Sequence, residues 1–159
     1  MESWIVGVWA PRPTGQCMKN IEASLADLCK VVDYINETIP ANAIIFLTGD
    51  LAAGKTTLAG AIAKSKGIEG EITSPTFSLQ NRYAEGIFHY DLYRIDFEEF
   101  VSLGLFEELD NDGWHLIEWG RDKLKATLVG AGYECYEVDI GSAIDKSAER
   151  IYKIGKLNA

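Results

Sequence analysis

An unbroken apolar segment runs from Ala43 to Thr48, with the sequence Ala-Ile-Ile-Phe-Leu-Thr. A short run of β-branched and aromatic residues is typical of a strand that is buried on both faces of a sheet. Pro40-Ala41-Asn42 breaks the chain before this run, and the segment 55–64 that follows has a composition compatible with a helix. A buried strand followed closely by a helix predicts an α/β arrangement.

Strand and helix periods recur along the rest of the chain. After a candidate N-cap, Ser24, with an acid three residues later, apolar positions share one helical face: Leu25, Leu28, Val32 and Ile35. Further strands are expected at 78–83, 87–90, 114–118, 133–140 and 148–154, and helices at 97–103 and 122–128. The first two of these strands read as a hairpin and the last two as a terminal antiparallel pair. Hairpins added to a parallel core predict a mixed parallel and antiparallel sheet.

A complete G-x-x-x-x-G-K-[ST] phosphate-binding loop follows the apolar run. Its residues are Gly49, Asp50, Leu51, Ala52, Ala53, Gly54, Lys55 and Thr56. A turn that aims several backbone N–H groups at one phosphate needs glycine at its bends, and the lysine adds a mobile positive charge for the β and γ oxygens. The threonine hydroxyl is a ligand for Mg²⁺. Because a strand precedes the loop and a helix follows it, we predict a P-loop NTPase-like fold with three layers that binds a nucleoside triphosphate.

The length of 159 residues and the hydrophobic content of 47% fit a single domain with a sizeable core. No apolar run approaches the length of a membrane span. Residues 1–17 have no clear amphipathic period, and they lack the basic n-region and the small-residue cleavage site of a secretory signal. We interpret them as an N-terminal extension of uncertain role, and residues 18–159 as a single P-loop ATPase domain that begins at Met18.

The alternation of Trp4, Val6 and Val8 leaves another interpretation open, an extra strand. A chain that begins at Met18 and still folds and binds nucleotide would support the extension. Aggregation of that shortened chain would contradict it.

Charge and cysteine content narrow the class of function. The formal net charge is −9, from 24 acidic and 15 basic residues, and no cluster of Lys and Arg stands out. This argues against tight binding of nucleic acid by the chain alone, and it leaves either a basic protein partner or simple solubility as the reason for the acidity. The cysteines Cys17, Cys29 and Cys135 form no C-x-x-C pair, so neither a zinc site nor a disulfide framework is indicated, and a cytoplasmic setting is expected.

Two acids stand at the ends of predicted strands, where the transfer of a phosphoryl group from a Mg²⁺-bound triphosphate needs them. Glu118 follows a hydrophobic run, as in a Walker B element, and Asp91 ends the strand that begins at Ile87. One of them is expected to hold the metal and the other to orient the attacking water, and the sequence leaves their assignment open. A solvated carboxylate at a strand end is the alternative for each.

Four more residues are candidates of lower specificity. Thr76, in Ser-Pro-Thr, could act as a switch residue that reaches Mg²⁺ or the γ-phosphate, although a plain turn has the same sequence. His89 could assist catalysis, and a packed, hydrogen-bonded core histidine is the favoured interpretation. Arg94 and Arg121 could neutralise phosphate charge, or could form surface ion pairs.

The P-loop, Ser74-Pro75-Thr76-Phe77, the segment His89-Tyr90-Asp91-Leu92-Tyr93-Arg94 and Glu118-Trp119 follow one another along the chain. Together these segments resemble the TsaE family, formerly YjeE, of small bacterial P-loop ATPases of tRNA threonylcarbamoyladenosine synthesis. The resemblance covers about Ser24 to Arg121. It implies a mixed α/β ATPase that binds ATP and Mg²⁺, hydrolyses slowly alone, and works with TsaD and TsaB, so that tRNA is contacted mainly through those partners.

The resemblance also implies roles for individual residues. Lys55 would contact the phosphates, Thr56 and Glu118 would hold Mg²⁺, Asp91 would be needed for hydrolysis, and Thr76 would lie in the switch loop. The nucleotide would be bound by the loop with Thr57 and by a neighbouring aromatic residue, Trp119. The family usually has glycine where this chain has Ala52, which matters only if that position requires a positive φ.

Two other functions remain open. A small-metabolite kinase would need several arginines over the transferred phosphate, and the five arginines here are widely spread. A nucleotide sensor without catalysis would lose function in Lys55→Ala and tolerate Asp91→Ala.

Overall fold

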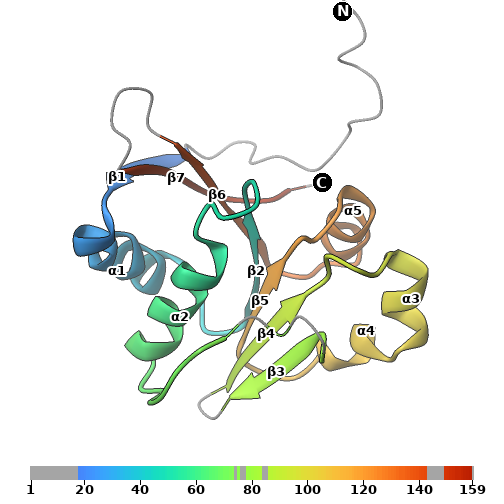
Figure 1. Ribbon diagram of the computed structural model, residues 1–159. Helices are drawn as coiled ribbons and strands as arrows, with labels where there is room; N and C mark the ends of the chain where they lie inside the picture. Colours follow the sequence, from blue (N-terminus) through green and yellow to red (C-terminus); the bar gives the residue numbers. More distant parts are fainter. Residues whose placement is uncertain (1–17, 74, 76–77, 84–85, 143–148, 159) are drawn as a thin grey trace, which may run out of the picture.

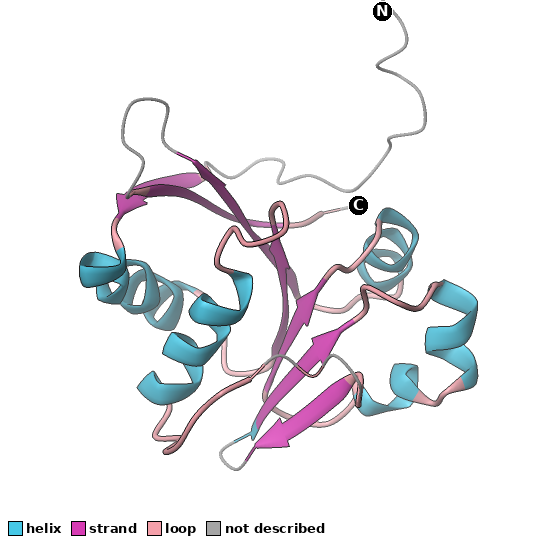
Figure 2. Ribbon diagram, viewed as in Figure 1, coloured by secondary structure: helices cyan, strands magenta, loops and turns pink. Residues whose placement is uncertain are grey.

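The computed structural model describes residues 18–73, 75, 78–83, 86–142 and 149–158. These residues form a three-layer α/β structure in which helices cover both faces of one twisted sheet (Figures 1 and 2). Its seven strands are β1 (Lys19–Ala23), β2 (Ala43–Thr48), β3 (Gln80–Tyr83), β4 (Ile87–Asp91), β5 (Trp114–Glu118), β6 (Cys135–Ser142) and β7 (Arg150–Lys156). The helices are η2 (Leu25–Asp27), α1 (Leu28–Thr38), α2 (Lys55–Ser65), α3 (Phe97–Ser102), α4 (Leu105–Glu108) and α5 (Asp122–Gly130).

The sheet is mixed, as the sequence predicts. Its order is β1-β7-β6-β2-β5-β4-β3. Strands β6, β2, β5 and β4 run parallel to one another, whereas β3 pairs antiparallel with β4, and β7 pairs antiparallel with both β6 and β1. The expected hairpin and the expected terminal antiparallel pair are thus both confirmed.

Alternation along β2 divides the core into two clusters. Ala43, Ile45 and Leu47 pack into the cluster that contains α1 and α2, whereas Ile44 and Phe46 pack into the cluster on the opposite face, beneath α3, α4 and α5. Because successive side chains of a strand point to opposite faces, a continuous apolar strand is what a sheet covered on both sides requires.

The first helix differs from the prediction. Leu25 is 72% exposed, and Ser24 makes no side-chain capping bond, because residues 25–27 form a separate 3₁₀ turn and α1 begins at Leu28. The buried stripe of α1 is Leu28, Val31, Val32 and Ile35. The buried face of the helix therefore begins about one turn later than the sequence pattern predicts.

Strands β3, β6 and β7 begin two residues later than expected, the first two of them because of a local backbone feature. Leu79 has a φ of 65°, in the left-handed region, so β3 begins at Gln80. The N–H of Tyr133 donates to the carbonyl of Leu128 and closes the end of α5, so β6 begins at Cys135. The edge strand β1 and the single turn α4 were not predicted. Residues 1–17 and the hairpin residues 84–85 lie outside the described part of the chain.

In the described ranges, no helix is both long enough and apolar enough to cross a bilayer.

Candidate nucleotide-binding site

The carboxyl ends of three neighbouring parallel strands define the position of the site. Register places Glu118 of β5 opposite Leu47 of β2 on one side and opposite Asp91 of β4 on the other. The phosphate-binding loop leaves β2 at this same edge. Ligands of open α/β sheets bind at the carboxyl ends of the strands, and the two acids predicted from sequence lie side by side at this edge.

The loop has a conformation that explains its glycines. Gly49 and Gly54 have φ values of 145° and 110°, and helix α2 starts at the next residue, Lys55. The N–H of Ala53 donates to the carbonyl of Asp50 and closes the turn at 3.0 Å. A compact turn in front of a helix N-terminus gathers N–H groups and is an anion-binding arrangement.

Lys55 lies across the loop. Its Nζ donates to the carbonyls of Gly49 and Asp50, each at 2.8 Å, and lies 4.2 Å from the centre of the Trp119 ring. Burial lowers the pKa of this ammonium, and the negative charges of Glu118, Asp50 and Asp91 oppose that effect. A lysine surrounded by carbonyls, carboxylates and an aromatic face is well placed to exchange these contacts for phosphate oxygens.

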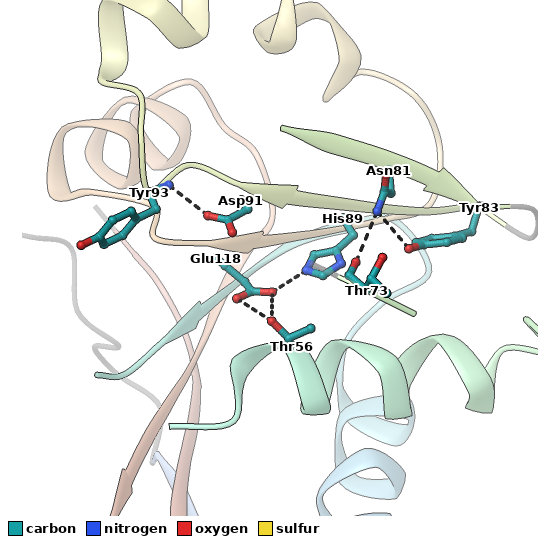
Figure 3. A network of polar contacts seen from close by, with 8 residues as sticks. All are labelled: Thr56, Thr73, Asn81, Tyr83, His89, Asp91, Tyr93 and Glu118. Atoms are coloured by element: carbon teal, nitrogen blue, oxygen red, sulfur yellow. Dashed lines mark hydrogen bonds and ion pairs between the residues drawn. The ribbon is translucent and has the colours of Figure 1, made fainter. Parts of the chain in front are cut away.

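Thr56 and Glu118 are in direct contact at the start of α2 (Figure 3). The Thr56 hydroxyl donates toward the Glu118 carboxylate, with Oγ1 at 3.1 Å from Oε1 and 3.0 Å from Oε2. The carboxylate is 3% exposed, and its Oε2 lies 2.6 Å from Nε2 of His89. The structure therefore joins the last residue of the phosphate-binding loop to the strand-end acid 62 residues later.

Asp91 lies beside this pair, on the neighbouring strand. It is 7% exposed, and its Oδ1 accepts a hydrogen bond from the N–H of Tyr93 at 3.0 Å. That bond fixes the carboxylate at the mouth of the site, next to Glu118 (Figure 3). The Asp91 carboxylate accepts from the backbone of Tyr93, whereas the Glu118 carboxylate contacts the side chains of Thr56 and His89.

Trp119 covers the lysine. Its φ is 63°, an uncommon conformation for a large L-residue, and its ring meets the ring of Tyr93 edge-on with centres 4.9 Å apart. Left-handed backbone at a bulky residue costs free energy and often marks a functional site. Here it turns the indole from the end of β5 back over Lys55.

A cavity of about 340 Å³ opens between the loop and the strand ends. It is lined by Leu51, Ala52, Gly54, Lys55, Thr56, Thr57, Asp91, Glu118 and Trp119. A larger, more apolar cavity of about 490 Å³ shares Ala52, Gly54 and Thr57 with it and continues toward Tyr152 and Arg150. The two together offer a polar end and an apolar end with the phosphate-binding loop between them.

Most of the candidate residues from sequence thus come together, and some do not. Gly49, Asp50 and Ala53 shape the loop without lining the polar cavity. Arg121 donates to the carbonyls of Ile95 and Tyr93 and so fastens the segment after β4, and neither it nor Arg94 lines that cavity. Thr76 lies outside the described residues, so its role as a switch stays a prediction.

His89 is the residue whose place the sequence left undecided. It is a buried, hydrogen-bonded core histidine, as favoured, and its partner is the carboxylate at the centre of the site. Strand alternation offered a signal, because His89 is two residues before Asp91 and therefore faces the same side of the sheet.

The oxygen donors fit Mg²⁺ in kind. Mg²⁺ prefers oxygen ligands and is usually held by one or two protein groups together with phosphates of the substrate. The hydroxyl of Thr56 and the carboxylate of Glu118 already face each other. Within the described residues there is no cluster of three His, Cys, Asp or Glu side chains that could hold a metal ion by itself.

Ala52 has a φ of 65°, so the position where the family usually has glycine does require left-handed backbone. An L-residue with this backbone conformation destabilises the folded state by roughly 1–2 kcal/mol. A glycine avoids this strain, but it increases the conformational entropy of the unfolded chain, which lowers the free energy of unfolding by about 0.4–1 kcal/mol. We expect Ala52→Gly to leave the free energy of unfolding unchanged or raise it by up to about 1 kcal/mol, with no loss of ADP affinity. Denaturant titration and calorimetric ADP binding measure the two quantities.

Ala53→Gly is the matched control, because the neighbouring Ala53 is not among the described residues with positive φ. That variant should lose about 0.5–1 kcal/mol of unfolding free energy. Weaker ADP binding by Ala52→Gly alone would contradict this view of the loop.

Fold and site together define a protein of the P-loop NTPase-like α/β class. The sequence model of one family, described as "Threonylcarbamoyl adenosine biosynthesis protein TsaE", matches residues 22–150. The chain belongs to the TsaE family.

Individual relatives agree with this assignment. The tRNA threonylcarbamoyladenosine biosynthesis protein TsaE of Treponema pallidum is 34% identical over 107 residues, which are 65% of this chain and 79% of the relative. The protein of the same name from Nostoc sp. is 47% identical over 74 residues, 45% of this chain and 46% of the relative. The protein of the same name from Haemophilus influenzae is 40% identical over 82 residues, which are 49% of this chain and 52% of the relative. The chain thus spans about half the length of several curated relatives that it matches.

The fold has a counterpart among solved structures. The crystal structure of YdiB from Bacillus subtilis superposes with a TM-score of 0.63, covering 91% of this chain and 90% of that one at 23% identity. This likeness supports the seven-stranded α/β fold alone.

Proposed function

We propose that this protein binds ATP with Mg²⁺, hydrolyses it slowly, and supports the threonylcarbamoyladenosine modification of tRNA together with TsaD and TsaB. The observation that best supports ATP hydrolysis is the contact between Thr56 and Glu118, which line one cavity together with Asp91 next to the phosphate-binding loop. Family membership supports the pathway.

The phosphates would lie in the polar cavity. The loop N–H groups and Lys55 would bind them, and Thr56 and Glu118 would hold Mg²⁺, which when bound supplies positive charge to the phosphate oxygens. Asp91 would orient the attacking water, because it lines the same cavity and the N–H of Tyr93 holds its carboxylate beside Glu118. This assigns the metal to Glu118 and the water to Asp91, which the sequence alone left open.

The nucleoside would occupy the apolar cavity. Its volume of about 490 Å³ falls in the range of small-molecule sites, roughly 300–1,000 Å³. Tyr152 supplies an aromatic wall, and Thr57 connects the two cavities. The phosphate-binding loop lies between them, so a nucleotide can extend from one into the other.

Slow ATP hydrolysis would follow from the small number of positively charged side chains at the polar cavity. Among the described residues that line the polar cavity, Lys55 is the cationic one and none is an arginine. An arginine supplied to the transferring phosphate accelerates related NTPases by about 10³–10⁵-fold. We infer that a partner protein supplies the arginine that the described lining of this cavity does not contain.

The division of labour in the modification complex follows from charge. With a net charge of −9, this chain repels a polyanion, so TsaD and TsaB would carry most of the contact with tRNA. Such work places the protein in the cytoplasm. The functional unit would be residues 18–159, since β1 starts at Lys19 and completes the edge of the sheet against β7.

ATP turnover alone and with partners tests the proposal. We expect phosphate release by the isolated protein to be slow, and to rise at least about 10-fold when TsaB and TsaD are added, because the missing positive charge arrives in trans. Asp91→Asn should remain slow under both conditions. Turnover that partners leave unchanged would contradict the proposal, and turnover that depends on a small hydroxyl compound would favour a kinase.

A further inference from the structure

His89, on β4, lies beside the carboxylate of Glu118 and points toward it, and Thr56 points toward the same carboxylate from the start of α2 (Figure 3). Its side chain is 1% exposed, and its Nε2 is 2.6 Å from Glu118 Oε2. In the parallel register of β4 and β5, His89 is opposite Leu116, so Glu118 is its diagonal neighbour two residues further along the same face.

The direction of this hydrogen bond follows from its partners. A carboxylate oxygen only accepts, so Nε2 of His89 is the donor. The same oxygen, Oε2, also lies 3.0 Å from the hydroxyl of Thr56. One oxygen of the carboxylate thus contacts both His89 and Thr56.

The other histidine shows what a purely structural role looks like. His115 is engaged through both ring nitrogens, with Nδ1 at 2.7 Å from the Tyr90 hydroxyl and Nε2 at 2.8 Å from the carbonyl of Asn111. In contrast, Nδ1 of the buried His89 has no hydrogen-bonding partner among the described residues. Burial of the polar His89 imidazole destabilises the folded state unless its nitrogens form hydrogen bonds. Among the described contacts, the hydrogen bond from Nε2 to Glu118 offsets this cost.

We propose that His89 is a positioning residue that holds the Glu118 carboxylate toward Thr56 and thereby sets the affinity of the nucleotide complex for Mg²⁺. This inference rests on the proposed function, in which Thr56 and Glu118 hold the cation. Partners that orient a metal-binding side chain typically contribute about 10–100-fold to metal affinity. A side chain that merely fills space would not change the requirement for Mg²⁺.

Two variants of similar length and volume separate positioning from packing. His89→Gln keeps an N–H donor near the place of Nε2, whereas His89→Met fills the same space without a donor. We expect the Mg²⁺ concentration that gives half-maximal strengthening of ADP binding to rise about 10–100-fold in His89→Met and to stay within about 3-fold of wild type in His89→Gln. Calorimetric titration of ADP at graded Mg²⁺ concentrations measures this quantity without any turnover.

The same titration in EDTA supplies the internal control. ADP affinity without Mg²⁺ should be the same for wild type and both variants, because Lys55 and the loop are untouched. His115→Gln, in the other buried histidine, should leave the Mg²⁺ requirement unchanged while it lowers the melting temperature. If the Met variant does not fold, His89→Asn replaces it, because its shorter amide does not reach Glu118.

The outcomes are distinct. Equal Mg²⁺ requirements in wild type, Gln and Met variants would overturn the inference and leave the proposed function intact, as would an equal loss of ADP affinity with and without Mg²⁺. A wild-type protein that binds no nucleotide at any Mg²⁺ concentration would overturn the proposed function itself.

Discussion

Replacing Glu118 with glutamine is expected to remove nearly all Mg²⁺-dependent ATP turnover. The amide keeps the shape of the side chain and can still accept a hydrogen bond from Thr56, but it carries no charge for the cation. A metal ion contributes several kcal/mol to the stabilisation of a phosphoryl-transfer transition state, so we expect a loss of at least about 100-fold in phosphate release with TsaB and TsaD present. The free energy of unfolding should change by no more than about 1 kcal/mol, since the carboxamide remains hydrogen-bonded.

The matched control is Glu137→Gln. Glu137 is a partly buried acid on another central strand, and its Oε2 lies 2.7 Å from Nζ of Lys125, outside the lining of the two candidate cavities. That variant should lose stability because it leaves Lys125 without its charge partner, and it should retain turnover. Equal turnover by the Glu118 variant and wild type would show that another group holds the cation.

The second large effect is expected from Gly49→Ala, at the first residue of the loop. A Cβ on Gly49 would lie 2.7 Å from the carbonyl oxygen of Ile140 and 3.0 Å from Cβ of Ala53, and the φ of 145° is unfavourable for any L-residue. Strain and overcrowding of this kind cost about 2–3 kcal/mol of unfolding free energy. The carbonyl that holds Lys55 must then shift, and ADP binding should weaken by ~30-fold or more.

Gly130→Ala is the control for this substitution. Gly130 is the last residue of α5, and an added Cβ there would meet no atom within 4 Å. Alanine is favoured over glycine in a helix, so this variant should gain up to about 1 kcal/mol and bind ADP normally. Denaturant titration and ADP calorimetry on both variants settle the comparison, and normal ADP binding by Gly49→Ala would contradict the loop geometry described above.

The central strands could be predicted from sequence because their burial on two faces leaves an unambiguous pattern. Strand β2 is found at the bounds expected for it, Ala43–Thr48, and β5 likewise at Trp114–Glu118. The loop between β2 and α2 has a fixed motif, so its place was equally clear. These elements form the candidate nucleotide-binding site.

The periphery could not be predicted in the same way. Strand β1, Lys-Asn-Ile-Glu-Ala, is polar and mostly exposed. It forms a strand because it pairs antiparallel with β7, near the other end of the chain, where Ile21 lies opposite Tyr152. Leu25 has the right spacing for the buried face of a helix, yet it is 72% exposed because the helix begins only at Leu28. Whether β1 is a strand depends on its pairing with β7, and whether Leu25 is buried depends on the residue at which the helix begins. The local pattern of apolar residues specifies neither.

The acids of the site could be placed from sequence, whereas their roles needed the three-dimensional arrangement. Position at strand ends identified Asp91 and Glu118, but only the fold shows that Thr56 meets Glu118 and that Tyr93 holds Asp91. The surroundings of Arg121, a candidate for phosphate binding, also became clear only from the fold. Its guanidinium donates hydrogen bonds to the carbonyls of Tyr93 and Ile95. A kinase lid of arginines therefore gains no support from it.

The most direct test of the central claim is the amount of threonylcarbamoyladenosine formed in tRNA by TsaD and TsaB over repeated turnovers, with ATP, Mg²⁺ and a threonylcarbamoyl donor. We expect wild type and Glu137→Gln to sustain modification, and Glu118→Gln to support no more than a reaction without this protein. Equal yields of modified tRNA from wild type and Glu118→Gln would contradict an ATP-hydrolysing role for this site.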